Sequence, residues 1–419
     1  MKVVHINSYD GSGGAARAAA RLNEALKLQQ VESEFIVNYK YGTDTSIKTF
    51  SEGKLARLYA FFLIGLEHVY TKLQIKKVKI PFSIPFIGKS IEKHPLIKAA
   101  DILHLHWTNQ GFLTISSLKK LLAMGKPVVW TFHDSYAFTG GCHVRYSCEN
   151  YKAECGNCPV VKNPSPRDVS HQFWLKKKAL YAEYQFQVIT PSNWLGNAVK
   201  QSSLMNNFNV QVIPNAIDAD LFKPTNKTEA RNKLNLNSNR FIMLSGFMPS
   251  KVDMHKGTSY LLEALEMLAS KVDLSQVELV IFGNKPDAEK PSFKIKTTYL
   301  GIINNDAELA TIYSAAHVFL TTTLEDNLPN TVMESLSCGT PVISFTTGGV
   351  PDMVSHQQNG YLAQYKSSED FCNGILWAFN HPNREVLNEN ARQTVEQKFS
   401  LTAVGHKHLE LYKTLLQKS

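Results

Sequence analysis

The length, composition and charge of the chain indicate a globular protein of two or three domains. Of its 419 residues, 43% are hydrophobic and 19% are charged, which allows a sizeable core in each domain. No apolar run reaches the ~18 residues of a membrane-spanning helix, and Met1 and Lys2 lead directly into an apolar strand without a cleavage site. We therefore expect a cytoplasmic protein whose six cysteines form no disulfides.

The positive charge is concentrated in one segment. The whole chain carries +9, and residues 51–100 hold nine Lys or Arg against three Glu, beside the aromatic-rich run LARLYAFFLIGLEHVY. Such a segment predicts peripheral contact with an anionic membrane. The alternative is that its apolar side chains are buried and its lysines form a solvated face. The basic residues carry no recognisable nucleic-acid motif, so no nucleic-acid partner is expected.

The first half of the chain begins as strand, glycine loop and helix. KVVHIN (residues 2–7) predicts a strand, and Gly11, Gly13 and Gly14 precede an Ala-rich helix. The loop matches neither a P-loop nor a G-x-G-x-x-G fingerprint, which argues against dinucleotide binding. The glycines indicate either a tight turn or a loop that approaches a ligand.

Two later strands in this half carry histidines. ILHLHW places His104 and His106 on one face of a strand, but no third metal ligand is evident. PVVWTF (residues 127–132) ends in His133 and Asp134. The carboxyl end of a parallel strand is where open α/β folds bind ligands, so His133 is a candidate ligand-binding residue.

A cysteine-rich loop follows over residues 142–158. Its spacing is C-x5-C-x6-C-x2-C, formed by Cys142, Cys148, Cys155 and Cys158. Four thiolates can bind Zn²⁺ tetrahedrally, and a closed site of this kind would be structural, not catalytic. The alternatives are reduced packing cysteines or a redox pair.

The second half repeats the α/β alternation after a polar linker over residues 214–226. Its most informative stretch is HVFLTTTLEDNLPNTVMESLSCGTPVISFTTGGVPDMV, residues 317–354. It predicts a strand, an acidic loop, a short helix opened by Thr331–Glu334 and a second strand, PVISF. The helix amino terminus would hold a phosphate through its free N–H groups. Thr331 and Glu334 also fit a capping box, which any helix can have.

Residues 317–354 resemble the donor-nucleotide site of family 4 glycosyltransferases, retaining enzymes of the GT-B fold. Their usual pattern is two Glu residues with seven residues between them, and Asp326 and Glu334 have that spacing. Asp stands where the family has its first Glu, and Glu325 is the rival candidate for that position. The resemblance implies that the first acid binds the transferred sugar and that Glu334 binds the nucleotide ribose.

The resemblance implies further donor contacts. Lys256, before a helix, matches a lysine that neutralises the diphosphate, whereas the usual arginine is missing because Phe247 follows Gly246. His133 would contact the donor sugar. The remaining implied substrate contacts come from the glycine loop, the acidic loop and the helix start: Gly13, Gly14, Asn327, Leu328, Asn330 and Thr331.

For the whole chain, the resemblance implies two Rossmann-like domains facing across a cleft, over residues 1–213 and 227–398. A closing helix over residues 399–419 would cross back to the first domain. The implied reaction is transfer of a sugar from a nucleotide-sugar to a glycan or lipid-linked glycan in capsule, lipopolysaccharide or exopolysaccharide synthesis, without a catalytic cofactor. The alternatives are another GT-B enzyme such as a nucleotide-sugar epimerase, and a basic zinc-bearing nucleic-acid-binding protein.

Overall fold

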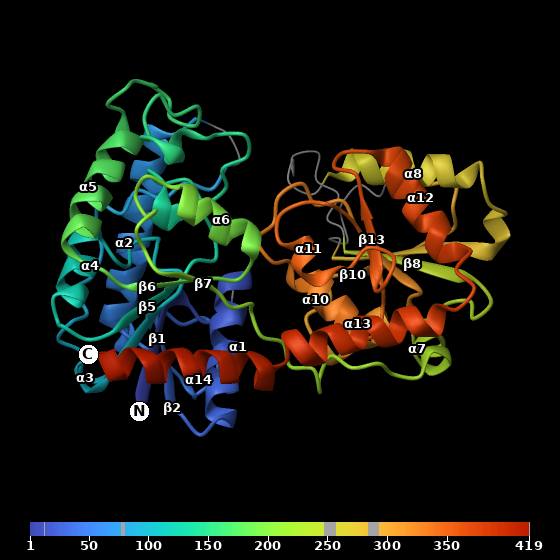
Figure 1. Cartoon of the computed structure of the whole chain (residues 1–419), viewed down its shortest axis with the longest axis horizontal. Helices are drawn as coiled ribbons and strands as arrows, with labels where there is room; N and C mark the ends of the chain where they lie inside the picture. The colour runs from blue at the N-terminus through green and yellow to red at the C-terminus, as the bar shows by residue number, and fades with distance from the viewer. Residues whose placement is uncertain (12, 77–79, 247–256, 284–292, 419) are drawn as a thin grey trace. The chain divides into compact units, whose positions relative to one another are not determined.

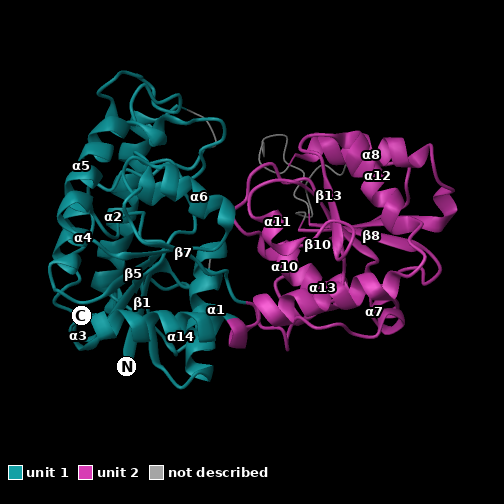
Figure 2. Ribbon diagram, in the orientation of Figure 1, with its two compact units in different colours: residues 1–216, 404–419 teal, residues 217–403 magenta. Residues whose placement is uncertain are grey.

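The computed structural model describes residues 1–11, 13–76, 80–246, 257–283 and 293–418 (Figure 1). The chain divides into two compact units, shown in different colours in Figure 2. Unit 1 consists of Met1–Ala216 and Val404–Ser419, and unit 2 consists of Ile217–Ala403.

Unit 1 is built on a seven-stranded parallel sheet in the order β3-β2-β1-β4-β5-β6-β7. The strands are β1 (Lys2–Tyr9), β2 (Glu32–Tyr39), β3 (Ile47–Thr49), β4 (Ile102–Leu105), β5 (Val128–Thr131), β6 (Gln187–Thr190) and β7 (Val210–Val212). The helices are α1 (Gly14–Leu28), α2 (Gly53–Gln74), α3 (Pro95–Ala99), α4 (Ile115–Leu122), α5 (Val169–Glu183), α6 (Asn193–Gln201) and α14 (Leu401–Lys418).

The central strands of unit 1 are buried because both of their faces are covered. Every residue of β4, β5 and β6 is buried, as is all of β1 after Lys2. Continuous burial is typical of parallel sheets between helical layers. The strand order reverses between β1 and β4, and such a reversal opens a crevice beyond the carboxyl ends of the two strands.

Unit 2 is built on a six-stranded parallel sheet in the order β10-β9-β8-β11-β12-β13. The strands are β8 (Phe241–Gly246), β9 (Val277–Phe282), β10 (Thr297–Gly301), β11 (Val318–Thr321), β12 (Val342–Phe345) and β13 (Gly360–Ala363). The helices are α7 (Lys227–Lys233), α8 (Thr258–Ala269), α9 (Asp306–Ala315), α10 (Asn330–Ser337), α11 (Val350–Met353), α12 (Ser368–Phe379) and α13 (Arg384–Lys398).

Unit 2 has a hydrophobic core on each face of its sheet, because successive strand residues point to opposite faces. In β11, Phe319 packs into one core, whereas Val318 and Leu320 pack into the other. In β12, Val342 and Ile343 divide in the same way. The predicted α/β class with two parallel sheets is confirmed.

The last helix, α14, packs on unit 1. Gly405 lies so close to α1 that a Cβ atom there would be 2.7 Å from the carbonyl oxygen of Ala25. Further along α14, Tyr412 is fully buried, and its hydroxyl hydrogen-bonds to His104 of β4. The predicted return of the C-terminal helix to the first domain is confirmed. Among the helices of the described residues, none has the length and hydropathy needed to cross a bilayer.

Candidate functional site

The acidic loop of unit 2 lies at the switch point of its sheet. The strand order reverses between β8 and β11, and Glu325, Asp326 and Asn327 follow β11. All three side chains are half-buried, whereas Leu328 is buried. Open α/β sheets bind their ligands at such a position, so the structure places the predicted donor acids where a ligand is expected.

A neighbouring turn, residues 346–349, fixes the backbone of the acidic loop. The hydroxyl of Thr347 donates to the carbonyl of Leu324 at 2.7 Å, and Gly349 N–H donates to the carbonyl of Asp326 at 3.1 Å. Gly348 has a φ of +53°, and a Cβ atom there would lie 1.9 Å from the Asp326 carbonyl oxygen. Only glycine fits both the dihedral angle and the space, so the close contact between this turn and the acidic loop depends on glycine at position 348.

Substitution of Gly348 by alanine tests this contact. We expect Gly348→Ala to lower the free energy of unfolding by more than the ~1–2 kcal/mol of a left-handed alanine, because Asp326 must also move. Gly301→Ala is the matched control, since Gly301 also has a positive φ, +75°, but has no atom within 4 Å of an added Cβ. Urea unfolding measures both variants. Equal losses would show that the contact with Asp326 contributes nothing.

Helix α10 presents Glu334 on its buried side. The helix begins at Asn330, with Pro329 as its N-cap and no side-chain capping bond, so the capping-box alternative for Thr331 and Glu334 is wrong. Glu334 is 1% exposed, and its Oε2 atom accepts a hydrogen bond from the hydroxyl of Tyr313 at 3.4 Å. Asn330 and Thr331 are half-buried in the first turn.

The start of α8 meets the end of β11. Gly257, the N-cap of α8, has a left-handed conformation, and a Cβ atom there would lie 2.2 Å from the carbonyl oxygen of Thr322. The amino end of α8 is therefore beside the acidic loop, where its N–H groups favour an anion. Lys256, the predicted diphosphate contact, lies outside the described residues, and its role stays a prediction.

In unit 1, the glycine loop follows β1. Gly13 is the N-cap of α1 with φ 90° and ψ 165°, and Gly14 is the first residue of the helix. An added Cβ at Gly13 would have no atom within 4 Å, so its conformation, and not its packing, requires glycine. Asp10 holds this loop to the one after β2, because its carboxylate accepts N–H bonds from Tyr41 and Gly42 at 2.9 and 2.7 Å.

His133 follows β5 and is half-buried. Its Nε2 atom lies 3.1 Å from Nδ1 of His106, and the two rings stack at an interplanar angle of 23°. Burial lowers the pKa of His133 to about 4, although Asp134 opposes the shift. His133 is therefore a neutral imidazole at physiological pH.

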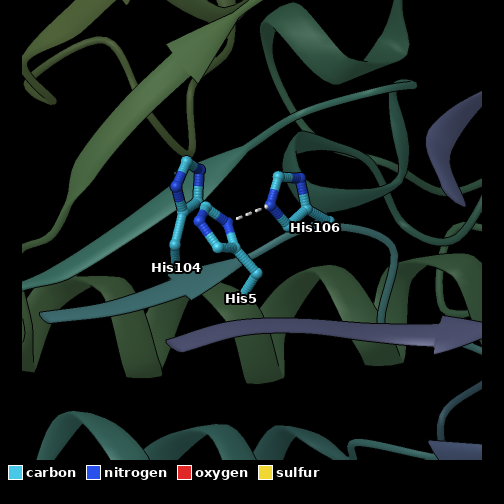
Figure 3. A group of neighbouring side chains, drawn as sticks. All are labelled: His5, His104 and His106. Carbon is cyan, nitrogen blue, oxygen red and sulfur yellow. Dashed lines mark hydrogen bonds between the residues drawn. The ribbon is translucent and has the colours of Figure 1, made fainter. Parts of the chain in front are cut away.

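Behind His133 lies a group of buried histidines that the sequence only partly revealed. Figure 3 shows His5, His104 and His106, whose ring nitrogens come within 4.8 Å of one another. Desolvation lowers the pKa of His5 to about 3 and those of His104 and His106 well below 6.5. His408 of α14 completes the group, with a pKa lowered to about 4 by burial. His5 was not assigned to this group from the sequence. It lies opposite His104 because the strand KVVHIN pairs with the strand ILHLHW.

Hydrogen bonds account for the arrangement of these rings. Both nitrogens of His104 contact hydroxyl groups, Nδ1 that of Tyr412 at 2.6 Å and Nε2 that of Thr131 at 2.7 Å. His5 Nδ1 lies 3.0 Å from His106 Nε2. A metal ion would have to displace a hydroxyl from His104, so the group fits a hydrogen-bonded network better than a metal centre.

The cysteine loop does not form a comparable cluster. All four cysteines lie within the described residues, yet they are not among the side-chain groups there that are close enough to hold a metal ion. Burial raises the pKa of both Cys142 and Cys155 to about 12, so both thiols are protonated at neutral pH. The structural zinc site stays a prediction.

Asp134 holds the cysteine loop in place. Its carboxylate lies 2.6 Å from Nδ1 of His143, whose Nε2 lies 2.8 Å from the hydroxyl of Ser83. Serine hydrolases use the same three residue types in this order, but Ser83 and His143 are 4% and 7% exposed. These three side chains therefore connect the segment around Ser83 to the cysteine loop. An isolated antiparallel β-bridge between Phe82 and Cys142 connects the same two segments.

The buried histidines predict that acid destabilises unit 1. Unfolded histidine titrates near pH 6.5, whereas His5 and His408 stay neutral in the folded chain to about pH 3 and 4. The unfolded chain therefore binds more protons below pH 6.5, and stability that is complete above this pH is lost as the pH falls. The slope is at most about 1.4 kcal/mol per pH unit for each ring.

Denaturant titrations between pH 7 and 4.5 measure this loss. His408→Asn should reduce the slope by one proton, because the amide can still donate to the Val404 carbonyl that His408 Nδ1 contacts but cannot titrate. His68→Asn is the control, since His68 is exposed. An unchanged slope in His408→Asn would contradict the assignment.

Two family models match the chain. The model described as Glycosyltransferase Family 4 matches residues 12–221, half of the chain, and the model described as Glycosyl transferases group 1 matches residues 226–394. The first match contains the glycine loop and His133, and the second contains the acidic loop and α10.

Individual relatives are distant, and they match different shares of the chain. Glycosyl transferase WcaC of Escherichia coli K12, named for colanic acid biosynthesis, is 24% identical over 82% of this chain and 83% of its own length. The UDP-Gal:alpha-D-GlcNAc-diphosphoundecaprenol alpha-1,3-galactosyltransferase of Escherichia coli is 22% identical over 48% of this chain and 54% of its own. The structure of Anabaena Alr3699/HepE in complex with UDP and glucose matches with a TM-score of 0.63 at 16% identity, over 99% of this chain and all of the other.

Proposed function

The chain belongs to glycosyltransferase family 4, and we propose that it moves a sugar from a nucleotide-sugar donor, with retention at the anomeric carbon, to a hydroxyl of a glycan or lipid-linked glycan. The observation that carries this proposal is the position of Asp326 and Glu334 beside the switch point of the second sheet. The GT-B fold predicted from the sequence is confirmed. The family assignment favours this reaction over the epimerase and nucleic-acid-binding alternatives.

The donor would be bound by complementary groups around the acidic loop. We assign Glu334 to the ribose hydroxyls and Asp326, or Glu325 beside it, to a hydroxyl of the transferred sugar. Asn327 and Leu328 would line the same position. The N–H groups of the first turn of α10, at Asn330 and Thr331, would donate hydrogen bonds to phosphate oxygens. These dipoles and Lys256 would stabilise the charge of the departing nucleoside diphosphate, so the proposal requires no catalytic cofactor.

Two groups of unit 1 complete the proposal. His133 would contact the transferred sugar as a neutral hydrogen-bonding group. The loop at Gly13 and Gly14, at the amino end of α1, would approach the diphosphate and the acceptor, because a glycine loop lets a ligand come close to the backbone. Both features follow strands of the first sheet at its carboxyl edge.

The similar proteins suggest a substrate class. WcaC is named for colanic acid biosynthesis, and the galactosyltransferase for a diphosphoundecaprenol-linked acceptor. The Anabaena protein has been solved with UDP and with UDP-glucose. On this basis we propose a UDP-sugar as donor and a cell-surface polysaccharide intermediate as acceptor.

A donor screen tests the enzyme proposal. We expect one class among UDP-, GDP- and ADP-sugars to raise the unfolding temperature of the wild-type chain and to label an added glycan acceptor when the sugar is radioactive. Glu334→Gln should weaken the binding of that donor by about 10-fold or more, because it removes a charged hydrogen-bond acceptor from a buried site.

Glu308→Gln is the matched control, because Glu308 is an exposed acid on α9 of the same unit. Calorimetry compares the donor affinities of the two variants. If Glu334→Gln binds the donor as tightly as Glu308→Gln does, Glu334 has no role at the ribose.

Helix α2 has two sides of different character, one that faces the core and one that exposes apolar side chains. Its side toward the core buries Glu67, which accepts an N–H bond from Gly111 at 2.6 Å. Seven large apolar side chains on the same helix are more than half exposed: Leu55, Leu58, Tyr59, Phe61, Phe62, Val69 and Leu73. All but Phe61 fall within an arc of about 100° at the helical repeat of 100° per residue. The alternative that the apolar side chains of residues 51–100 are buried therefore fails for these seven, although it holds for Leu63 and Ile84.

We propose that this apolar face of α2 docks on an anionic membrane. A stripe of exposed apolar side chains is unusual on a soluble surface, and the same helix carries Lys54, Arg57 and Lys72. Apolar side chains that enter the lipid headgroup region beside basic side chains that bind lipid phosphates are typical of interfacial helices. Docking of this kind would bring the enzyme to a lipid-linked acceptor.

Vesicle sedimentation tests the docking face. Wild-type protein should bind anionic vesicles and bind neutral vesicles less, and the triple variant Leu55→Ser, Leu58→Ser, Phe62→Ser should lose about 10-fold or more in affinity. The control is Leu28→Ser with Leu175→Ser, two exposed leucines of unit 1 on other helices. Equal binding by the triple variant and the control would contradict membrane docking. A dimer that the triple variant disrupts would assign the face to a second copy of the chain.

A further inference from the structure

Three imidazole rings form a hydrogen-bonded chain from the interior of unit 1 to His133. His5 Nδ1 lies 3.0 Å from His106 Nε2, the bond drawn in Figure 3, and His106 Nδ1 lies 3.1 Å from His133 Nε2. His5 is completely buried and His106 is 2% exposed. Each of these bonds needs one N–H donor and one bare nitrogen, so the three rings cannot choose their tautomers independently.

The rings are held for this bonding by the sheet beneath them. The N–H of His106 donates to the carbonyl of Ile6 at 2.9 Å, and the indole of Trp130 donates to the carbonyl of His106 at 2.9 Å. The His104 ring stacks on that of His106 with centroids 4.4 Å apart. Backbone bonds thus fix the position of His106 independently of its ring nitrogens.

Burial leaves one proton on each ring at neutral pH. It lowers the pKa of His5 to about 3 and that of His133 to about 4, so neither ring is an imidazolium. A neutral imidazole has one donor and one acceptor. The hydrogen bonds between the three rings therefore have two possible directions. Either every donated ring proton points toward His133, or every one points away from it.

The surroundings of His5, the innermost of the three rings, decide between these two directions. His5 Nε2 is buried and has no hydrogen-bond partner among the described residues. If the protons pointed away from His133, this atom would be a buried N–H without an acceptor, and buried donors without a partner are rarer in folded proteins than buried acceptors without one. The nearby His104 offers no acceptor to it, because both His104 nitrogens already contact hydroxyls. The protons therefore point toward His133.

We propose that His106, supported by His5, positions His133 and fixes it as the neutral tautomer with its proton on Nδ1. His106 would donate from Nδ1 to His133 Nε2, and His5 would donate from Nδ1 to His106 Nε2. His133 then offers an N–H donor to an oxygen of the transferred sugar. This inference rests on the proposed function, in which His133 contacts that sugar.

The neutral state of His133 and the position of its proton matter because positive charge develops on the sugar during transfer. The anomeric carbon becomes oxocarbenium-like and positive, so an imidazolium nearby would repel the transition state. A neutral ring that donates a hydrogen bond can orient the sugar without adding positive charge. His106 and His5 touch no substrate in this scheme, and both act only through the orientation and protonation of His133.

Long-range proton–nitrogen NMR of the full chain with labelled histidine tests the tautomer directly. The His133 signals are identified by their loss in His133→Ala. In the wild type we expect a protonated Nδ1 and a bare Nε2. His106→Leu should abolish this preference, whereas His106→Asn should keep it, because the amide retains a donor close to the position of Nδ1. A protonated Nε2 in the wild type would overturn the proposal without any variant.

Kinetics separates positioning from general damage to the fold. We expect His106→Leu to lower kcat about 10-fold with little change in KM for the nucleotide-sugar, and His106→Asn to restore most of this loss. In a His133→Ala background, His106→Leu should cost less than about 2-fold more, because its effect passes through His133. His171→Leu is the matched control, since His171 is buried at 7% exposure but outside the chain of rings.

The outcomes distinguish this inference from the proposed function. If His133→Ala leaves turnover unchanged, His133 has no role in the reaction and the proposed contact fails, while the NMR result still decides the direction of the chain. If His133→Ala lowers turnover but His106→Leu multiplies that loss in the double variant, the positioning role of His106 is overturned and the role of His133 stands.

Discussion

The arrangement of both units depends on one constraint, the parallel pairing of their strands. Parallel strands deliver their carboxyl ends to one edge of a sheet, so loops far apart in the sequence become neighbours there. In unit 2 this brings the loop after β11 against the turn after β12, and in unit 1 it brings His133 after β5 beside His106 after β4. The positions of these loops thus follow from strand order, whereas Glu334 and His408 come from the helices α10 and α14.

Patterns that are local in the sequence predicted much of this structure. The buried strands, the two α/β alternations and the spacing of Asp326 and Glu334 could all be inferred, because each depends on residues close together in the chain. Features that depend on pairing between strands could not. His5 joined the histidine group only through the register of β1 with β4, and the contact of Gly348 with Asp326 required β11 and β12 to be neighbours.

Two interpretations failed for identifiable physical reasons. Thr331 and Glu334 have the spacing of a capping box, but Pro329 already provides the N-cap, so α10 starts earlier and Glu334 faces Tyr313. Composition also could not show which side of α2 faces water. In the structure, Glu67 faces the core, where Gly111 donates to it, and the exposed leucines and phenylalanines lie on the side that faces water.

The close contact between Gly348 and the carbonyl of Asp326 limits how this loop can vary. A Cβ atom at position 348 would lie 1.9 Å from the Asp326 carbonyl oxygen, so the turn and the acidic loop are closely packed there. Aspartate, one methylene shorter than the glutamate usual in the family, must hold its carboxylate closer to the main chain. In the proposed donor complex, a sugar hydroxyl that donates to Asp326 would therefore lie closer to the main chain than one that donates to a glutamate, and the choice of acid would set the depth at which the sugar lies.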